Sequence, residues 1–443
     1  MYPLALVGVF LGLIVLGVLL GALTGLAPGL HVNNVAALLL ATREFWASWV
    51  ESWVDGARTD PMLVGILLSA FLVATAASHS IFSFIPSVFL GAPTEDTALA
   101  TLPGHRLLLA GKGAKAVALA ARGAVLGTAF AVVLLIPLRF LLDGPILLAE
   151  RFRPMTAAFL VGLLVVILLS ELRGRNRGRR ILRSGWVQAL AGLLGIVTLR
   201  GAVPLPPNLA LFPLFAGLFG LPTLFVSLRG PPGRVPPQTL ESLRPLGRQE
   251  IGNALRGAAA GAAISWLPGL SGGVAATLAS LGRRKRSGPN QFMVVLGAVS
   301  SSTALLSVAV LFMIQRTRSG VAAGVRVLLG DPGGPSAWGP VPDAILPLVV
   351  AAVLATAVAA PLAAGLARRA ARTWSLVDSR RISALSLLVI QGLLFFVTGP
   401  VGLAVAGVAT LVGLVPIAFR VRRIHLMASL LVPLLLSYLL PTS

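Results

Sequence analysis

The chain contains no cysteine, and charged residues make up only 11% of its 443 residues. The missing cysteines exclude a disulfide framework, a thiolate nucleophile, a zinc ribbon and an iron–sulfur cluster. A soluble domain has about a quarter of its residues charged, which keeps its surface in water. Because 56% of these residues are hydrophobic, the composition predicts a membrane protein that crosses the bilayer many times, located in the cell membrane.

Acidic residues are also scarce: 14 Asp and Glu stand against 36 Lys and Arg, which gives a formal charge of +22. The basic residues gather between apolar runs, as the positive-inside rule requires. The strongest clusters lie at 173–180, 283–286, 368–372 and 420–423. If all of them face the cytoplasm, the acidic loop at 43–60 falls outside. Arg422 in the last cluster is then expected to be an ordinary surface residue.

Apolar runs of spanning length predict an all-α fold of about 10 or 11 transmembrane helices. The runs lie near 4–27, 61–78, 114–140, 154–171, 185–199, 207–227, 291–315, 343–366, 382–398, 400–418 and 425–441. Shorter apolar pieces are too brief or too interrupted to cross alone, so we expect half-helices or re-entrant hairpins there. These pieces lie at 31–41, 79–92, 251–267, 271–282 and 321–330.

One motif occurs in both halves of the chain. Gly21-x-x-x-Gly25-x-x-Pro28-Gly29-Leu30 is matched by Gly261-x-x-x-Ser265-x-x-Pro268-Gly269-Leu270. An odd number of predicted crossings separates the copies, so the second copy would be inverted in the membrane relative to the first, as in many secondary transporters. The predicted organisation is a first repeat over 1–140, connecting helices over 141–249, a second repeat over 250–366 and C-terminal helices over 367–443.

The Pro-Gly pairs predict helix breaks, because proline lacks a backbone N–H and glycine tolerates positive φ. In hydrocarbon a break survives only where protein or a wet cavity satisfies the freed backbone groups, so two breaks predict a central cavity. Each half-helix that follows would point its N-terminus, with about half a positive charge, into this cavity. The alternative is that the prolines only kink ordinary spans and the glycines only pack helices closely.

The predicted anion site therefore combines the residues around both breaks with hydroxyl groups from the span 291–315. Its members are Pro28, Gly29, His31, Asn33, Asn34, Pro268, Gly269, Ser271, Gly272, Gly273, Ser300, Ser301 and Ser302. Ser271 is a plausible N-cap for the second half-helix, and four hydroxyl residues in succession at 300–303 must point some of their side chains into the protein interior.

Ionisable groups near the predicted site are candidates to couple transport to Na⁺ or H⁺. They are His79, Glu95 and Asp96, with His31 and His105 as further residues that titrate near neutrality. The structural alternatives are satisfied buried histidines and carboxylates that cap a helix after Pro93. No cofactor, metal site or nucleic-acid partner is expected. Enzyme motifs such as a P-loop or His-Glu-x-x-His are not found in the sequence.

Three stretches of the chain resemble the TctA-like permease subunit of tripartite tricarboxylate transporters, in an archaeal-type version. They are Gly21 to Asn34, the segment 91–113 with Leu102-Pro103-Gly104-His105-Arg106, and Gly257 to Leu281 followed by the basic cluster 283–286. More distantly, Pro268-Gly269-Leu270-Ser271-Gly272-Gly273 is similar to the second hairpin of bacterial undecaprenyl-phosphate translocases. Both resemblances imply inverted repeats and an anionic cargo. At His31-Val32-Asn33-Asn34 the chain departs from the glycine-rich continuation usual in the tricarboxylate permeases.

Three functions follow from these observations. A secondary transporter of small carboxylates is favoured, a polyprenyl-phosphate lipid translocase is the alternative, and an intramembrane enzyme of lipid-phosphate metabolism is the third. The expected partners are the lipid bilayer, an anionic small molecule or lipid phosphate, and a small membrane subunit or a second copy of the chain.

Overall fold

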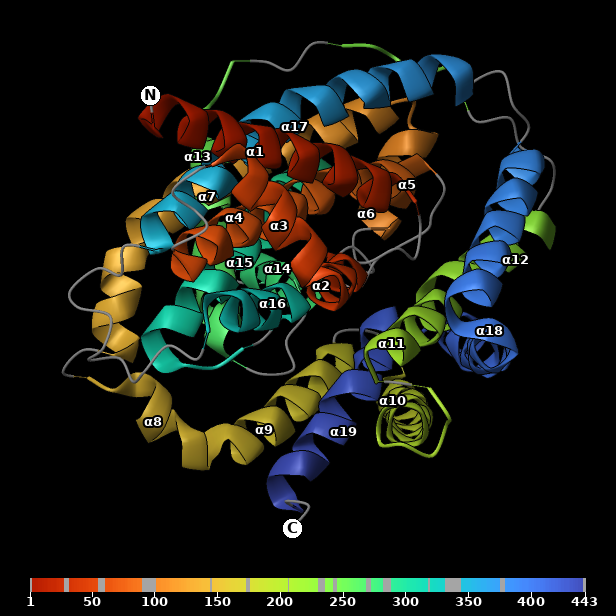
Figure 1. The fold of residues 1–443 in the computed structure, drawn as a ribbon. Helices are drawn as coiled ribbons and strands as arrows, with labels where there is room; N and C mark the ends of the chain where they lie inside the picture. The colour runs from red at the N-terminus through yellow and green to blue at the C-terminus, as the bar shows by residue number, and fades with distance from the viewer. Residues whose placement is uncertain are drawn as a thin grey trace.

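A computed structural model provides the structure of the chain (Figure 1). It describes residues 2–27, 32–54, 60–89, 101–143, 146–172, 176–205, 207–229, 236–241, 245–267, 272–281, 288–317, 319–330, 344–374 and 379–440. All regular elements in these residues are helices, which confirms the predicted all-α fold.

One group of helices forms the larger body of the molecule, in red, orange, teal and light blue in Figure 1. Its members are α1 (Tyr2–Leu26), α2 (Val32–Ala41), α3 (Arg43–Trp53), α4 (Pro61–Phe82), α5 (Phe84–Phe89), α6 (Thr101–Leu109), α7 (Gly113–Leu142), α13 (Arg248–Trp266), α14 (Gly272–Leu281), α15 (Pro289–Ile314), α16 (Gly320–Leu329) and α17 (Ile345–Trp374). Two segments far apart in sequence, α1 to α7 and α13 to α17, thus build one body.

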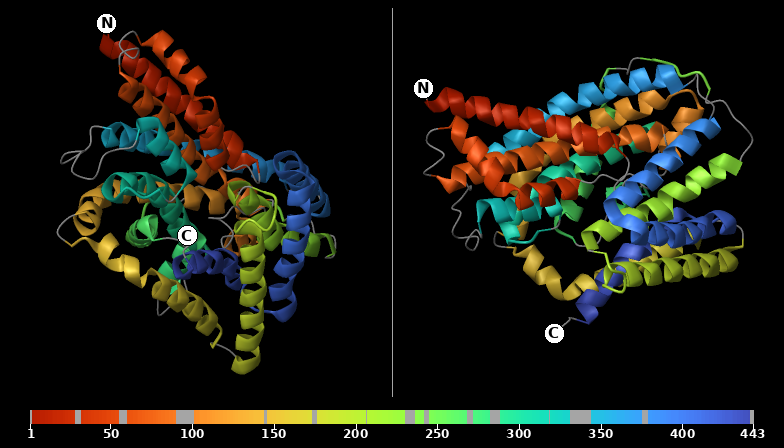
Figure 2. Two further views of the ribbon diagram at one scale, coloured as in Figure 1. Left: turned by 60° about the horizontal axis from the view of Figure 1, so that its bottom comes forward. Right: turned by 45° about the vertical axis from the view of Figure 1, so that its right-hand side comes forward.

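The remaining helices form a second layer on one side of this body, as the right-hand view of Figure 2 shows. They are α8 (Leu148–Phe152), α9 (Thr156–Leu169), α10 (Arg177–Leu199), α11 (Pro207–Phe215), α12 (Leu221–Arg229), α18 (Ser379–Phe419) and α19 (Ala428–Leu439). Short 3₁₀ segments extend α8 and α9 and precede α19, and a π-helical turn at Ala216–Gly220 joins α11 to α12. The chain therefore leaves the first body after α7, returns to it at α13 and leaves it again after α17.

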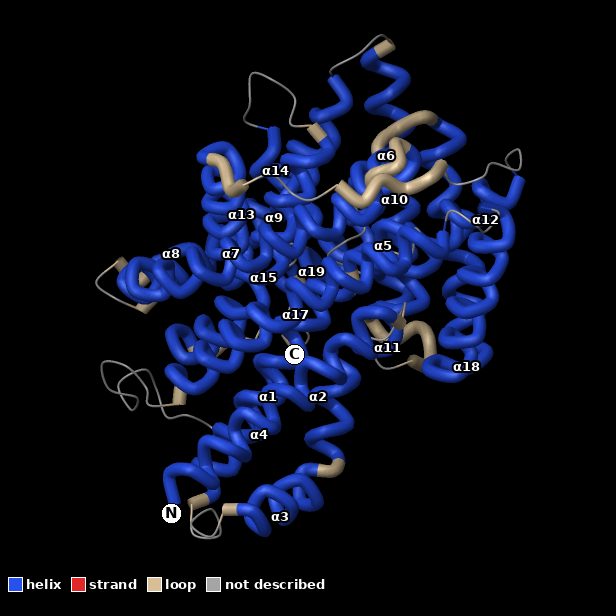
Figure 3. Tube along the Cα trace, turned by 90° about the horizontal axis from the view of Figure 1, so that it is seen from above, coloured by secondary structure: helices blue, strands red, loops and turns tan. Residues whose placement is uncertain are grey.

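Eight helices in the described part of the chain are long and apolar enough to cross a membrane, and three shorter apolar helices accompany them. Each of the predicted spanning runs lies on one of these helices. The runs 382–398 and 400–418 both lie in α18, which is interrupted at Gly399, where φ is 65°. Most of the described chain is helical, and short loops connect the helices, as the view from above shows (Figure 3). The chain is a multi-pass membrane protein.

The centre of the larger body consists of α4 and α15. In the apolar stretch of α4 78% of the residues are buried, and in that of α15 89% are buried. In the apolar stretches of α1 and α7 only 28% are buried. Both central helices carry hydroxyl groups, among them Ser78 and Ser302, which would be costly against lipid tails. The exposed apolar residues of α1 and α7, such as Leu19 and Val133, suit the lipid, because in a membrane the outside of a helix is as apolar as its packed side.

The prediction of a separate half-helix or re-entrant piece that begins at 79, opened by Ser78 and His79, is wrong for the described part of 79–92. Both residues lie inside α4, which continues to Phe82, and α5 follows after one residue. The His79 Nδ1 atom lies 3.0 Å from the Thr24 hydroxyl of α1. Because this hydrogen bond satisfies a polar side chain inside the protein, the helix has no need to end there.

Candidate functional site

Both Pro-Gly pairs lie between helices. Before the first Pro-Gly pair α1 ends at Leu26, and after it α2 begins at Val32. Before the second pair α13 ends at Trp266, and after it α14 begins at Gly272. Pro28, Gly29, His31, Pro268, Gly269 and Ser271 fall in the intervals and lie outside the described residues. The backbones of Asn33 and Asn34 belong to the first turn of α2, and Gly272 and Gly273 open α14. The predicted carboxylates Glu95 and Asp96 also lie outside the described residues.

The helices that precede the breaks pack against the two central helices in a matched way. A Cβ atom added to Gly21 of α1 would collide with the Ser78 hydroxyl of α4. A Cβ atom added to Gly261 of α13 would collide with the Ser302 hydroxyl of α15. Glycine is required at both positions because the helix backbones approach too closely for any side chain.

The match extends one turn earlier in each helix. A Cβ atom at Gly17 would lie 2.7 Å from the carbonyl oxygen of Phe71, and one at Gly257 would lie 2.5 Å from that of Val295. Gly17 and Gly257 are each four residues before the glycines that face the serines, and Phe71 and Val295 are each seven residues before those serines. The same register of glycines and facing residues therefore holds over two turns of both helix pairs.

The predicted serines of α15 are all buried in this packing. Ser302 donates a hydrogen bond to the Ala298 carbonyl oxygen of its own helix at 2.6 Å, as Ser78 does to Ala74 at 2.6 Å. Ser301 donates to the Ala124 carbonyl of α7 at 2.8 Å, and this bond ties α15 to the neighbouring helix. The Ser300 hydroxyl has no hydrogen-bond partner among the described residues. A role for these serines in the wall of a substrate site stays a prediction.

Two of the histidines predicted to titrate are described. His79 lies in the buried part of α4, near the end of α1. His105 lies on the short helix α6, and burial lowers the pKa of its imidazole. The Nδ1 atom of His105 is buried and has no partner in the described part of the chain. The lowered pKa of His105 favours the neutral form of its imidazole at physiological pH.

A buried carboxylate that the sequence reasoning did not select joins three helices of the second layer. Glu171, at the end of α9, has a fully buried side chain and forms an ion pair with Arg180 of α10. Its other oxygen accepts a hydrogen bond from the backbone N–H of Arg422 at 3.0 Å and lies 3.5 Å from the His425 Nε2 atom. The only signal in the sequence was one acidic residue at the end of an otherwise apolar run.

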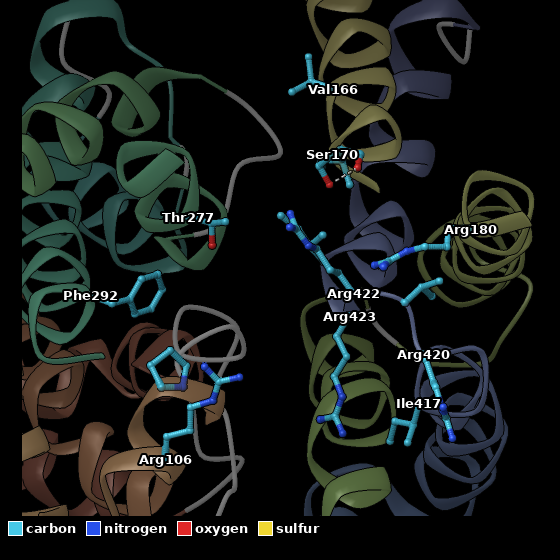
Figure 4. A pocket seen from close by; sticks show the side chains of 14 residues that line it. Arg106, Val166, Ser170, Arg180, Thr277, Phe292, Ile417, Arg420, Arg422 and Arg423 are labelled. Atoms are coloured by element: carbon cyan, nitrogen blue, oxygen red, sulfur yellow. Dashed lines mark hydrogen bonds between the residues drawn. The ribbon is translucent and has the colours of Figure 1, made fainter. Parts of the chain in front are cut away.

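A cavity of about 480 Å³ lies beside this cluster, between the two layers of helices. Figure 4 shows Arg106, Thr277 and Phe292 on the wall from the larger body, facing Arg180 and Arg422 on the wall from the second layer. Arg422 is exposed, as expected of a surface residue, but it also lines the cavity and its backbone N–H holds Glu171, so it is not a neutral control. The residues come from distant segments, and their spacing in the sequence did not indicate a shared site.

Comparison with known proteins identifies the family of the chain. A family model described as the tripartite tricarboxylate transporter TctA family matches residues 11–428. The chain belongs to this family. The resemblance that the Pro-Gly motifs indicated is therefore confirmed, and this TctA family member belongs to a transporter family rather than to an enzyme family.

A curated relative gives no further functional description. This relative is named uncharacterized protein MJ1079, from Methanocaldococcus jannaschii, and is 27% identical over 315 residues. The aligned part covers 71% of this TctA family member and 72% of the relative. No solved structure matches the chain. The site must therefore be interpreted from the geometry of the chain itself.

Proposed function

We propose that this TctA family member is a secondary transporter of an anionic substrate, most closely a small carboxylate, which binds between two inverted repeats. The observation that carries the proposal is the matched packing of α1 with α4 and of α13 with α15. Equal glycine-to-serine contacts at Gly21 and Gly261 are expected when two segments share one fold. The repeats would comprise the helices up to α7 and those from α13 to α17.

The opposite orientation of the repeats is supported by the crossings between them. Five segments long or apolar enough to cross lie between α1 of the first repeat and α13 of the second. They are α4 together with α5, then α7, α9 and α10, and finally α11 together with α12. If the α1–α2 hairpin returns to the side from which α1 enters and each of these five segments crosses once, α13 enters the membrane from the side opposite to α1. Such inverted repeats place the substrate near the middle of the bilayer, where the repeats meet.

A contact between α7 and α17 also supports a two-fold relation. The Thr128 hydroxyl of α7 lies 3.3 Å from the Thr356 hydroxyl of α17, and both residues are buried. Each threonine follows a small buried residue, Gly127 in α7 and Ala355 in α17. Residues at matching positions contact each other when they lie close to a two-fold axis.

The proposed anion site uses the N-termini of α2 and α14, which begin directly after the breaks. Each helix N-terminus offers unpaired N–H groups and is worth up to about 2 kcal/mol for an anion in a partly buried site. Hydrogen bonds to a charged group add about 1.5–3 kcal/mol each. A site of this strength holds a carboxylate and still releases it, as transport requires.

The family description supplies the substrate class and the partners of the proposal. A tripartite tricarboxylate transporter implies a small-carboxylate cargo and further subunits, so we expect this chain to work with a small membrane subunit. Ion-gradient coupling is expected, with His79, Glu95 and Asp96 as the candidate groups. A polyprenyl-phosphate cargo is the alternative, and hydrolysis of a lipid phosphate is the third possibility.

The test is binding and uptake with the purified full chain in liposomes, comparing radiolabelled citrate with a polyprenyl phosphate. In Gly272→Leu the side chain at the first residue of α14 should block approach to the N–H groups and lower citrate affinity at least about tenfold. The matched control is Arg369→Gln, an exposed residue of α17 outside the cavity lining. Unchanged citrate affinity in a well-folded Gly272→Leu protein would place the anion elsewhere. Binding of the polyprenyl phosphate alone would support the lipid translocase.

A further inference from the structure

The cavity between the two helix layers is lined by residues other than those of the proposed transport site. One wall comes from α6, α14 and α15, and the other from α9, α10 and the segment that leads from α18 to α19 (Figure 4). Its volume of about 480 Å³ falls in the usual range of small-molecule sites, about 300–1,000 Å³.

The lining of the cavity is strongly positive. Five arginines line it: Arg106, Arg180, Arg420, Arg422 and Arg423. No carboxylate is among its described lining residues, and the adjacent Glu171 offsets a single positive charge. Arg106 and Arg420 form no ion pair with any carboxylate in the described ranges. Several guanidinium groups around one cavity repel one another, and a bound anion relieves that repulsion.

The arginines of the second layer are held in place by contacts with other groups. The Glu171 carboxylate fixes Arg180 and the backbone of Arg422. Arg423 donates a hydrogen bond to the Thr223 hydroxyl of α12 at 2.6 Å. Arg420 has a positive φ of 56°, in the left-handed region that non-glycine residues seldom adopt, and its side chain lines the cavity. Contacts within the fold therefore hold Arg180 and Arg423, while Arg106 and Arg420 are exposed.

The number and placement of the arginines favour a phosphate group over a carboxylate. A planar carboxylate is satisfied by one guanidinium fork and a few N–H groups, as Glu171 itself shows. A phosphomonoester carries about two negative charges and three strong acceptor oxygens, and a phosphodiester keeps about one charge and two such oxygens. Their tetrahedral arrangement suits a cavity with arginines on both walls, Arg106 on one and Arg420 and Arg423 on the other.

Apolar side chains surround the charged part of the cavity. The lining includes Val166, Ile167, Phe292, Ile417 and Ile424, and Val166 of α9 is 51% exposed. A phosphate attached to an apolar chain suits these surroundings, because the chain can lie along α9 while the phosphate reaches the arginines.

We propose that this cavity binds the phosphate group of an anionic ligand, either a phospholipid headgroup or a soluble phosphate compound, and that the ligand joins the two helix layers. The site is separate from the anion site at the helix breaks and does not depend on the cargo proposed there. Arg180 and Arg423, which Glu171 and Thr223 hold in place, distinguish it from an ordinary interfacial basic cluster, in which all the side chains extend freely into water.

The test uses the full chain in nanodiscs of phosphatidylcholine, with and without phosphatidylglycerol, and separately with inorganic pyrophosphate or citrate added. Bound lipid is counted by native mass spectrometry, and ligand affinity is taken from the shift in thermal unfolding. We expect Arg106→Gln and Arg420→Gln each to weaken phosphate binding about tenfold. Arg106→Lys should be intermediate, because it keeps the charge but loses the planar fork. Arg369→Gln removes the same charge outside the cavity and should change nothing.

The ligand probes separate the two sources of phosphate. Arginine-dependent binding of phosphatidylglycerol indicates a lipid headgroup, and arginine-dependent binding of pyrophosphate alone indicates a soluble phosphate; both support the proposal. It is overturned if neither probe binds, or if Arg369→Gln weakens binding as much as the cavity variants do. Arginine-dependent binding of citrate without phosphate binding would also overturn it, and would move the cargo site into the cavity. Since Arg106 and Arg420 are exposed, both glutamine variants are expected to fold.

Discussion

The two helix pairs at the centre of the molecule share their packing but differ in their chemistry. Ser78 in α4 and Ser302 in α15 occupy the same place against glycines, and both donate to a carbonyl four residues earlier. The next residue is His79 in the first pair and Thr303 in the second. His79 has the Thr24 hydroxyl as a partner, whereas the Thr303 hydroxyl is buried with no partner among the described residues.

The glycines and serines common to both pairs are explained by helix packing, whereas the difference between His79 and Thr303 is not. Close approach of two helices demands glycine and a small facing residue, so these types recur in both pairs. A titratable group serves no purpose in packing, and directly after the facing serine it occurs only in the first pair. His79 therefore stays the candidate of this pair for proton coupling, as a prediction.

The largest expected effect breaks the shared packing. Gly21→Leu and Gly261→Leu each force a side chain into the facing serine, and overpacking of this kind costs about 3 kcal/mol. Both variants should therefore show similar, large falls in the thermal unfolding midpoint measured in detergent. Equal losses would support the equivalence of the two pairs.

Matched controls exist on the same two helices. A Cβ atom at Gly12 of α1 or at Gly252 of α13 would meet no atom within 4 Å. Gly12→Leu and Gly252→Leu should leave the midpoint unchanged or raise it slightly, since leucine favours the helix over glycine by about 0.5–1 kcal/mol. A protein that tolerates Gly261→Leu and fails with Gly21→Leu would contradict the matched packing.

A second prediction sharpens the chemical difference between the pairs. Histidine titrates between about pH 5 and 8, so His79→Gln should abolish the pH dependence of uptake in that range if His79 couples protons. Thr303→Val should keep the pH dependence, and it should be as stable as the parent or up to about 1 kcal/mol more stable, because an unsatisfied buried hydroxyl is removed. Uptake is measured in liposomes at several pH values. A parental pH profile in His79→Gln would exclude His79 as the coupling group.

The smallest expected effect concerns the two serines. Ser78→Ala and Ser302→Ala each remove a hydroxyl that donates to a carbonyl four residues earlier in its own helix, which is worth about 0.5–1 kcal/mol. The Ser78 hydroxyl also lies 3.4 Å from the Gly17 carbonyl oxygen of α1, a long contact that adds little. The two losses of unfolding free energy should agree within about 0.5 kcal/mol. A much larger loss for one serine would show that its hydroxyl has a task that the other lacks.

Much of the fold was predictable because it depends on local requirements. Spanning length and apolar composition located the transmembrane helices, and Pro28-Gly29 and Pro268-Gly269 do lie between helices. The piece at 79–92 was misassigned because His79 looks like a polar end of an apolar run. Its partner Thr24 is 55 residues away in sequence, so nothing in the local pattern showed that the histidine is satisfied inside the helix bundle.

The sequence by itself determined that the chain enters the membrane, that it does so as helices, and that two of these end shortly before a Pro-Gly pair. These properties follow from hydrocarbon, which requires each segment to satisfy its own backbone. Only the tertiary structure decided which faces meet, such as Gly21 on Ser78, and which distant arginines share a cavity. In a membrane the packed and lipid-facing sides of a helix are equally apolar, so the periodicity of the sequence does not record which side packs.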